Sequence, residues 1–236
     1  MIRCSRSNFL RGGLLSLAAL AATASPARAD MVLSQVIVDF KPDRPQFQDV
    51  EVWNDSDERL YVAVEPARIV DPGQRGEVRR TNPDPAALGL LVSPQRLVLE
   101  PDQRRIVRVA AIADRDTIDR IYRVAIKPVA GPLQSQATAL KVLVGYDALV
   151  IVRPATVTGE VTATRQGRRI TFHNGSNTAQ ELFAGTQCVG TPQRKCATLP
   201  AKRLYAGADW SFDLSNDGPV EFSITDGSRT RRSLFR

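Results

Sequence analysis

From residue 32 onward the chain alternates short apolar runs with turn residues. Apolar side chains recur at every second position, and Pro, Gly, Asn and Asp separate the runs at short intervals, which is typical of a β-sandwich. The pattern predicts strands at residues 32–40, 47–53, 60–69, 90–93, 96–99, 105–112, 121–128 and 140–152. It predicts a second set at 159–164, 168–174, 181–188, 210–214, 220–225 and 231–235. We expect an all-β chain of two immunoglobulin-like β-sandwich domains.

The pair Arg153-Pro154 is the predicted boundary between the sandwiches. Proline cannot donate a hydrogen bond to a strand ladder, so it ends the strand before it. This places the first sandwich at residues 30–153 and the second at 154–236, with almost no linker between them. The polar, proline-bearing segment 73–87 is predicted to be a loop.

The last predicted strand of the first sandwich is unusually apolar. Residues 140–154 read LKVLVGYDALVIVRP, with apolar side chains alternating at Leu140, Val142 and Val144 and almost continuous from Ala148 to Val152. The last strand of such a sandwich lies at a sheet edge, where a long apolar strand invites aggregation unless a partner strand pairs with it. The alternative is that both faces of the strand are buried, one in the sandwich core and one against the second domain.

The first 29 residues predict a secretory signal peptide. Arg3, Arg6 and Arg11 precede an apolar run at residues 14–24, and Ala27-Arg28-Ala29 follows as a cleavage motif. The run is short of the ~20 residues needed to span a bilayer. We expect cleavage after Ala29 and an exported, periplasmic protein.

The net charge of the predicted mature chain bears on nucleic-acid binding. The whole chain has 32 Lys and Arg against 25 Asp and Glu. The leader carries four arginines and no acid, so 32 − 4 = 28 cations remain against 25 acids. This small excess of positive charge does not indicate a nucleic-acid-binding surface.

Two cysteines remain after cleavage of the leader, because Cys4 is removed with it. The remaining Cys188 and Cys196 predict a disulfide in an oxidising compartment, the alternative being two unpaired thiols.

The residues for catalysis are sparse. His173 is the only histidine. The sequence contains no nucleophile motif, no phosphate-binding loop and no metal-ligand spacing that could act with it. We expect no enzyme activity, no cofactor, no metal and no small-molecule substrate. An exported hydrolase built around His173 is the alternative, but a histidine at a strand end is more often a surface residue.

Several ordered motifs resemble periplasmic pilus-assembly chaperones of the chaperone–usher pathway. The stretch at residues 91–109 is similar to the "SPxxLxLxPGxxxxVRV" pattern of that family, and Ile121-Tyr122-Arg123-Val124 is similar to its penultimate strand in the first domain. The segment 140–154, ending in Arg-Pro, is similar to the final donor strand. Gly145-Tyr146, residues 196–207 and Trp210 are similar to the archaic, σ-type branch.

The resemblance implies donor-strand complementation. Such chaperones lay their last strand into the open groove of an incomplete pilus subunit and carry the subunit to an outer-membrane usher, without nucleotide or metal. On this chain the donor side chains would be Leu140, Val142, Val144 and Tyr146, each contributing roughly 1.5–3 kcal/mol when buried. The sequence leaves open whether the free protein caps this strand by forming a homo-oligomer. A two-domain structural pilin or surface-binding protein is the alternative function.

The chain departs from the family at the anchor for the subunit's terminal carboxylate. The family uses an arginine on the first strand and a lysine on the donor strand, and these positions fall on Ile37 and Leu149. We expect Arg123 and Lys127 on the neighbouring strand to replace them, the alternatives being no anchor at all or two ordinary surface cations. Arg153 is expected either to contact a subunit or to join the two domains.

Overall fold

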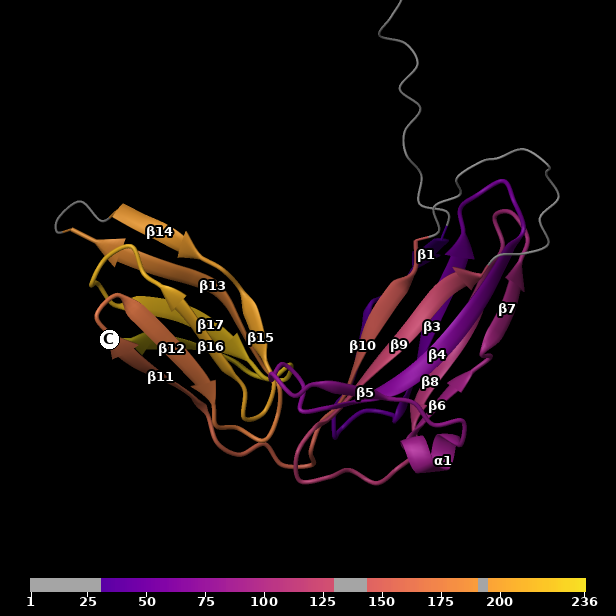
Figure 1. The fold of residues 1–236 in the computed structure, drawn as a ribbon, viewed down its shortest axis with the longest axis horizontal. Coiled ribbons are helices and arrows are strands. Elements are labelled where there is room, and N and C mark those ends of the chain that lie inside the picture. The colour runs from indigo at the N-terminus through magenta and orange to yellow at the C-terminus, as the bar shows by residue number, and fades with distance from the viewer. Residues whose placement is uncertain (1–30, 130–143, 191–194) are drawn as a thin grey trace, which may run out of the picture.

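The computed structural model describes residues 31–129, 144–190 and 195–236. The predicted signal peptide at 1–29 and the predicted donor residues Leu140 and Val142 lie outside the described residues. Figure 1 shows two β-sandwiches that meet at an angle, the first in indigo to magenta and the second in orange to yellow. The expected all-β, two-sandwich architecture is therefore confirmed.

The first sandwich consists of a four-stranded and a six-stranded sheet. The four-stranded sheet has the order β1 (Met31–Leu33), β3 (Phe47–Asn54), β8 (Arg104–Ala111), β6 (Leu90–Ser93). The other has the order β2 (Ile37–Phe40), β10 (Tyr146–Val152), β9 (Arg120–Val129), β4 (Leu60–Val70), β5 (Val78–Arg80), and β7 (Arg96–Leu99) also pairs with β4. The β2–β10 pair is parallel and the neighbouring pairs are antiparallel.

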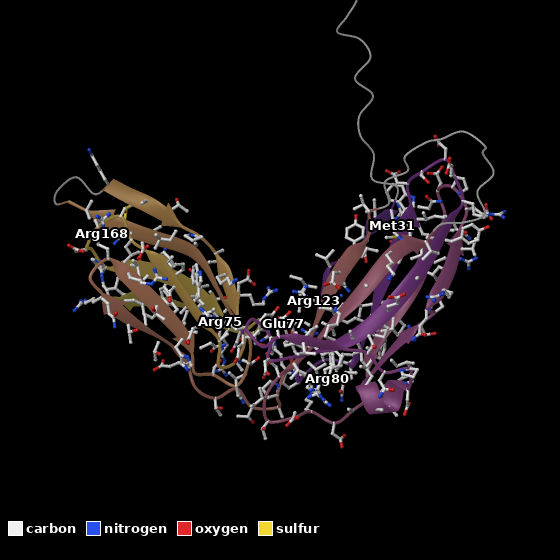
Figure 2. All side chains as sticks on the ribbon, in the orientation of Figure 1. Met31, Arg75, Glu77, Arg80, Arg123 and Arg168 are labelled. Atoms are coloured by element: carbon white, nitrogen blue, oxygen red, sulfur yellow. A yellow bond between two sulfur atoms is a disulfide. The ribbon has the colours of Figure 1, made fainter. Side chains whose placement is uncertain are left out.

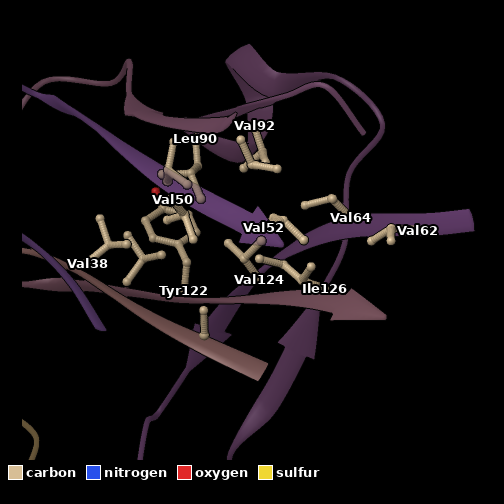
Figure 3. Packing of buried hydrophobic residues seen from close by; sticks show 14 of the residues in the cluster. Val38, Val50, Val52, Val62, Val64, Leu90, Val92, Tyr122, Val124 and Ile126 are labelled. Atoms are coloured by element: carbon tan, nitrogen blue, oxygen red, sulfur yellow. The ribbon is translucent and has the colours of Figure 1, made fainter. Parts of the chain in front are cut away.

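In the core of this sandwich, alternate side chains of each strand point between the two sheets, which accounts for the alternation of apolar residues in the sequence. Figure 3 shows Val50 and Val52 of one sheet meeting Val124 and Ile126 of the other around the ring of Tyr122. Tyr122 is fully buried. Burial of these side chains away from water is the main force that holds the two sheets together.

Two predictions about the first sandwich are wrong. Residues 32–40 form two strands in different sheets, because the chain crosses over after β1: Ser34 N donates to Glu51 O on β3, whereas Val36 O accepts from Leu149 N on β10. The predicted loop at 73–87 contains β5 and a short helix, α1 (Pro85–Leu88), capped by the Asp84 side chain. Both elements are too short and too exposed to show an apolar period.

The second sandwich consists of a three-stranded and a five-stranded sheet. The first has the order β11 (Val161–Gln166), β12 (Arg169–Asn174), β16 (Asp209–Asp213). The second has the order β14 (Lys195–Leu199), β13 (Gln180–Val189), β17 (Val220–Thr225), β18 (Thr230–Phe235), and β15 (Lys202–Leu204) also pairs with β13. Aromatic rings fill the core around Phe172, whose centroid lies 5.3 Å from that of Phe222 and 5.1 Å from that of Phe235. The sequence pattern missed β14 and β15.

A separate apolar cluster joins the two sandwiches. Ile69, Ile121, Leu149 and Ile151 lie on the outer face of the six-stranded sheet and pack against Ala179 of the second sandwich. Tyr205 of the second sandwich also packs against this cluster. The outer face near the end of β10 is therefore buried by the second sandwich rather than by the core of the first. In the described part of the chain, no helix has the length and apolarity needed to cross a membrane.

Candidate functional site

The strand β10 has neighbours on both sides along only part of its length. Its whole length pairs antiparallel with β9, whereas only residues 149–152 pair with β2. The β2 ladder begins where Leu149 N donates to Val36 O at 2.9 Å, and it ends where Arg153 N donates to Phe40 O at 3.1 Å. The prediction of a sheet-edge strand is therefore wrong for residues 149–152.

The first three residues of β10 do form an edge. Tyr146, Asp147 and Ala148 pair with β9 and, among the described strands, have no neighbour on the other side. Just before them Val144 is 63% exposed and lies outside any strand. Residues 148–152 are all buried. Among the described residues, one flank of the sheet is thus open at the start of β10 and closed from Leu149 onward.

The predicted donor side chains that the structure describes differ in how deeply they are buried in the first sandwich. Leu140 and Val142 lie outside the described residues, and Val144 projects from the chain without being buried. Tyr146 is half-buried, packs against the core of the first sandwich, and donates its hydroxyl to Met31 O at 2.9 Å. Of the two described donor residues, Val144 is the one with a free side chain.

Gly145 brings the start of β10 very close to β9. A Cβ atom at this position would lie 2.9 Å from Cβ of Lys127 and 3.1 Å from its Cα. Contacts this short are not tolerated between carbon atoms, so any larger residue would push the two strands apart. The glycine of the Gly145-Tyr146 pair is therefore explained by backbone approach, which the sequence pattern could not reveal.

Charged side chains gather on the outer face beside the open flank. Arg123 of β9 donates from Nη1 to the carbonyl of Asp147 at 3.2 Å, and its Nε lies 3.9 Å from the Asp147 carboxylate. The carboxylate also pairs with Arg79 of β5. Farther along β9, Lys127 Nζ lies 2.8 Å from the Glu65 carboxylate. Both predicted anchor residues are thus partly exposed cations that already have an acidic neighbour.

Arg123 occupies a particular place among these cations. Figure 2 shows it on the side of the first sandwich that faces the second. The positive charges of Arg123 and of Arg203 on β15 both act on Tyr205, although burial dominates and raises the pKa of that phenol. Arg123 therefore lies between the open flank of β10 and the junction of the two sandwiches. Arg123 was predicted from the sequence, whereas Arg79 was missed because it falls in the segment interpreted as a loop.

The junction contains a buried arginine that bonds to both sandwiches. Arg153 binds the Asp39 carboxylate through Nε at 2.7 Å and Nη2 at 3.0 Å. Its Nη1 donates to Thr178 Oγ1 at 2.9 Å and to Ala179 O at 3.0 Å in the second sandwich. Of the two expectations for Arg153, the structure supports the one in which it joins the domains.

A second acidic residue crosses the same junction. Asp119, just before β9, accepts a hydrogen bond from Ala179 N at 2.6 Å. Burial raises its pKa from 3.8 to about 6, and the bond from Ala179 and the charge of Arg153 only partly oppose this. A carboxylate that is costly to ionise therefore sits at the contact between the domains.

His173 lies on the outer face of the three-stranded sheet. Its ring is half exposed, and Nδ1 lies 2.7 Å from Oδ1 of Asp209 on β16. This agrees with the interpretation of His173 as a surface residue at a strand end. Within the residues described, no three or more His, Cys, Asp or Glu side chains come together in a way that could hold a metal ion.

The predicted disulfide is present. Cys188 and Cys196 lie opposite each other in the β13–β14 pair and are bonded. The bond ties β14, an exposed edge strand of the five-stranded sheet, to its neighbour. It lies in the second sandwich, whereas the open flank of β10 lies in the first.

The fold is shared with solved fimbrial chaperones. No protein-family model matches the chain, and no curated protein matches it. The class 5 fimbriae chaperone CfaA has a TM-score of 0.64 and 19% identity, covering 87% of this chain and 99% of that one. A chain of the Salmonella enterica SafA pilin–SafB chaperone complex has a TM-score of 0.61 and 17% identity, with 89% and 98% covered.

A third solved structure comes from an archaic system. A chain of the CsuC–CsuE chaperone–tip adhesion subunit pre-assembly complex, from the archaic chaperone–usher Csu pili of Acinetobacter baumannii, has a TM-score of 0.59 and 9% identity. The match covers 87% of this chain and 98% of that one. The resemblance seen in the sequence motifs is confirmed at the level of the fold: this chain has the two-sandwich architecture of fimbrial chaperones.

Proposed function

We propose that the chain is a periplasmic chaperone that binds pilus subunits by donor-strand complementation and delivers them to an outer-membrane usher. The single observation that carries this proposal is the open flank at the start of β10, preceded by the exposed Val144. Unpaired backbone groups at a sheet edge can bond to an added strand, and alternate side chains can fill that partner's pockets. Nothing in this mechanism requires a cofactor.

Support comes from the solved neighbours and from the sequence. The neighbours include chaperones in complex with a pilin and with a tip adhesion subunit. The alternation of Leu140, Val142 and Val144 continues toward the open flank and ends at Tyr146. We propose Leu140, Val142 and Val144 as the donor side chains. Tyr146 joins them only through the part of its ring that its own core leaves uncovered.

The alternative role as a structural pilin is less well supported. A pilin of this pathway lacks its own last strand, whereas the first sandwich here contains β10 bonded to β9 and β2. Fibres of the protein in electron micrographs would favour the pilin. The signal peptide ending at Ala29, and with it the periplasmic location, is part of the proposal and rests on the sequence.

Co-expression with a subunit encoded beside the gene tests the function. The wild-type chain is expected to yield a soluble one-to-one complex, and Val142→Asp/Val144→Asp is expected to yield none, because two charges would have to enter an apolar groove. A matched control is Thr162→Asp/Thr164→Asp, which places the same charges at exposed positions of β11. An unchanged yield with the first variant would remove the donor-strand assignment.

A further inference from the structure

Three arginines share one face of the six-stranded sheet at the end of the first sandwich where β9 begins. Arg68 on β4 is directly opposite Arg80 on β5 and, on its other side, directly opposite Tyr122 on β9. Residues that are directly opposite each other in an antiparallel ladder turn toward the same face. Arg120 precedes Tyr122 by two residues and therefore turns the same way. Figure 2 shows Arg80 at this end of the first sandwich.

The positive charges of these arginines are not balanced. Within the part of the chain that the structure describes, none of Arg68, Arg80 and Arg120 forms an ion pair with a carboxylate. Arg79, which turns to the other face of β5, does pair with Asp147. Like charges that are directly opposite each other destabilise a strand pair, so the Arg68–Arg80 pair is unfavourable by itself. A negative group between the guanidinium groups would convert this repulsion into attraction.

Two buried polar atoms in the same place have no hydrogen-bond partner. They are the hydroxyl oxygen of Tyr122 and Nε of Arg120, and among the described residues no other buried side-chain atom is unpaired in this way. Tyr122 is fully buried, and Figure 3 shows its ring among the core side chains. A buried polar group without a partner is costly and rare. Both atoms carry a hydrogen that can be donated to an acceptor.

The hydroxyl of Tyr122 and the guanidinium of Arg120 meet beside Gly89. A Cβ atom at Gly89 would lie 2.9 Å from the Tyr122 hydroxyl and 3.5 Å from Nη1 of Arg120. Gly89 ends α1 in the left-handed region, at a φ of 82°, so it has no side chain that could occupy this place. The fork of Arg120 is held by a bond from Nη2 to Ala113 O at 3.1 Å. The charges of Arg120 and Arg68 both act on the phenol, although burial dominates and raises the pKa of Tyr122.

We propose that this end of the first sandwich is a binding site for a small inorganic oxyanion of the phosphate type. Arg120 and Tyr122 donate to the anion from the buried side, and the exposed Arg68 and Arg80 close the site from the solvent side. Charge-assisted bonds from a guanidinium are strong, and its planar fork matches the oxygens of such an anion. The site is separate from the open flank, because Arg120 pairs with Val152 at the other end of β10.

The competing explanation is a buried water molecule with two solvated arginines beside it. A water molecule can accept from both unpaired donors, as buried waters commonly do. It carries no charge, however, and leaves the repulsion between Arg68 and Arg80 in place. The two explanations differ in how the protein responds to added anion. An anion site saturates and depends on the arginines, whereas a water site does neither.

The test is a titration of the purified, isotope-labelled chain with sodium phosphate, in which sodium chloride is exchanged to keep the ionic strength constant. The amide resonances of Gly89 and Ala113 report on the site. We expect saturable shifts in the wild type, and an Arg68→Gln/Arg80→Gln variant is expected to bind about tenfold more weakly or less. Tyr122→Phe keeps the ring and is expected to bind about three- to fivefold more weakly, because one hydrogen bond is lost.

The matched control removes two exposed arginines elsewhere in the same sandwich. Arg96→Gln/Arg105→Gln lowers the net charge by the same amount, at exposed positions of β7 and β8. This variant is expected to keep the wild-type affinity for phosphate, because any general effect of net charge is the same in both double variants. The dispersion of the amide spectrum shows whether each variant is folded before it is titrated.

Three results would overturn the proposal. Shifts in the wild type that grow linearly with phosphate and never saturate leave only the water explanation. Equal affinities of the two double variants show that Arg68 and Arg80 do not bind the anion. An unchanged affinity in Tyr122→Phe removes the buried hydroxyl from the site. None of these measurements involves the donor strand, so failure of this site and failure of the proposed function are distinguished.

Discussion

Leu149 lies directly opposite Ile37 where β10 and β2 run side by side, and neither side chain carries a charge. These are the two positions at which the chaperone resemblance leads one to expect a lysine and an arginine. The structure places the two positions side by side in the parallel ladder. Their environments differ, since Ile37 is 42% exposed and Leu149 is 4% exposed.

This difference predicts how the two positions respond to a basic residue. Ile37→Arg is expected to change the free energy of unfolding by no more than about 0.5 kcal/mol, because the side chain can stay in water. Leu149→Lys is expected to lose about 2–4 kcal/mol, because it removes apolar contacts with the junction cluster and buries an amine. Urea unfolding followed by the fluorescence of Trp53, in a Trp210→Phe background, reports on the first sandwich. Equal midpoints for the two variants would contradict this account.

The arginine at the junction predicts a large loss when it is removed. Arg153→Met leaves the Asp39 carboxylate without its bidentate partner and the Ala179 carbonyl without its donor. Breaking a buried pair from one side costs about 3–5 kcal/mol. Hydrogen exchange is expected to speed up in β2 and in residues 177–179.

The control for this prediction is an arginine that is exposed rather than buried. Arg104→Met removes a pair with Glu51 whose two charges lie 3.5 Å apart, and its cost is expected to stay within about 1 kcal/mol. If the two variants unfolded at the same denaturant concentration, Arg153 would not be holding the domains together.

Much of the fold could be predicted from the sequence because every second side chain along a strand is buried. The alternation of Tyr122, Val124 and Ile126 on β9 predicts an inward-facing strand, and the structure buries all three. The crossover between β1 and β2 could not be predicted, since both halves are apolar and only long-range pairing with β3 and β10 separates them. β5 and β14 could not be predicted either, because nearly all their side chains are exposed.

The candidate site was predictable only where a motif covered it. The apolar segment 140–152 was singled out by its pattern, and its proposed donor role and the candidate anchor Arg123 came from the resemblance. Arg79 lies in a segment without an apolar period. Asp147 was visible in the sequence as a charge within an apolar strand. Its pairing with two arginines depends on strand order, because β5 and β10 are separated in the sheet by β9 and β4.

Loss of the disulfide is expected to weaken the second sandwich alone. In a Cys188→Ser/Cys196→Ser variant the short β13–β14 loop is no longer closed, and the chain-entropy cost of such a loop corresponds to about 2–3 kcal/mol. Unfolding followed by Trp210 fluorescence, in a Trp53→Phe background, should shift to lower denaturant. Subunit binding below the transition should stay unchanged. Lost binding with an unshifted transition would instead assign the β13–β14 hairpin to the binding surface.

The raised pKa of Asp119 predicts how the junction depends on pH. Its pKa is about 6 in the folded chain against 3.8 for the free side chain, so the folded state binds the proton more tightly. The contribution of this residue to stability is therefore fully present below about pH 4. It is lost as the pH rises through about 6, and the difference between the two pKa values corresponds to about 3 kcal/mol. The groups that face it are Ala179 N–H, the Thr178 hydroxyl, Arg153 and Asp39.

Asp119→Asn isolates this effect from the other titrating groups. The amide oxygen can still accept the bond from Ala179 N but cannot ionise, so the variant should become more stable relative to the wild type as the pH rises from about 4 to 7. The difference in unfolding free energy should level off above about pH 7. Asp114→Asn, in the loop between β8 and β9, is a control for a general change in charge. If the difference in unfolding free energy between Asp119→Asn and the wild type stayed constant over this pH range, ionisation of Asp119 would not destabilise the junction.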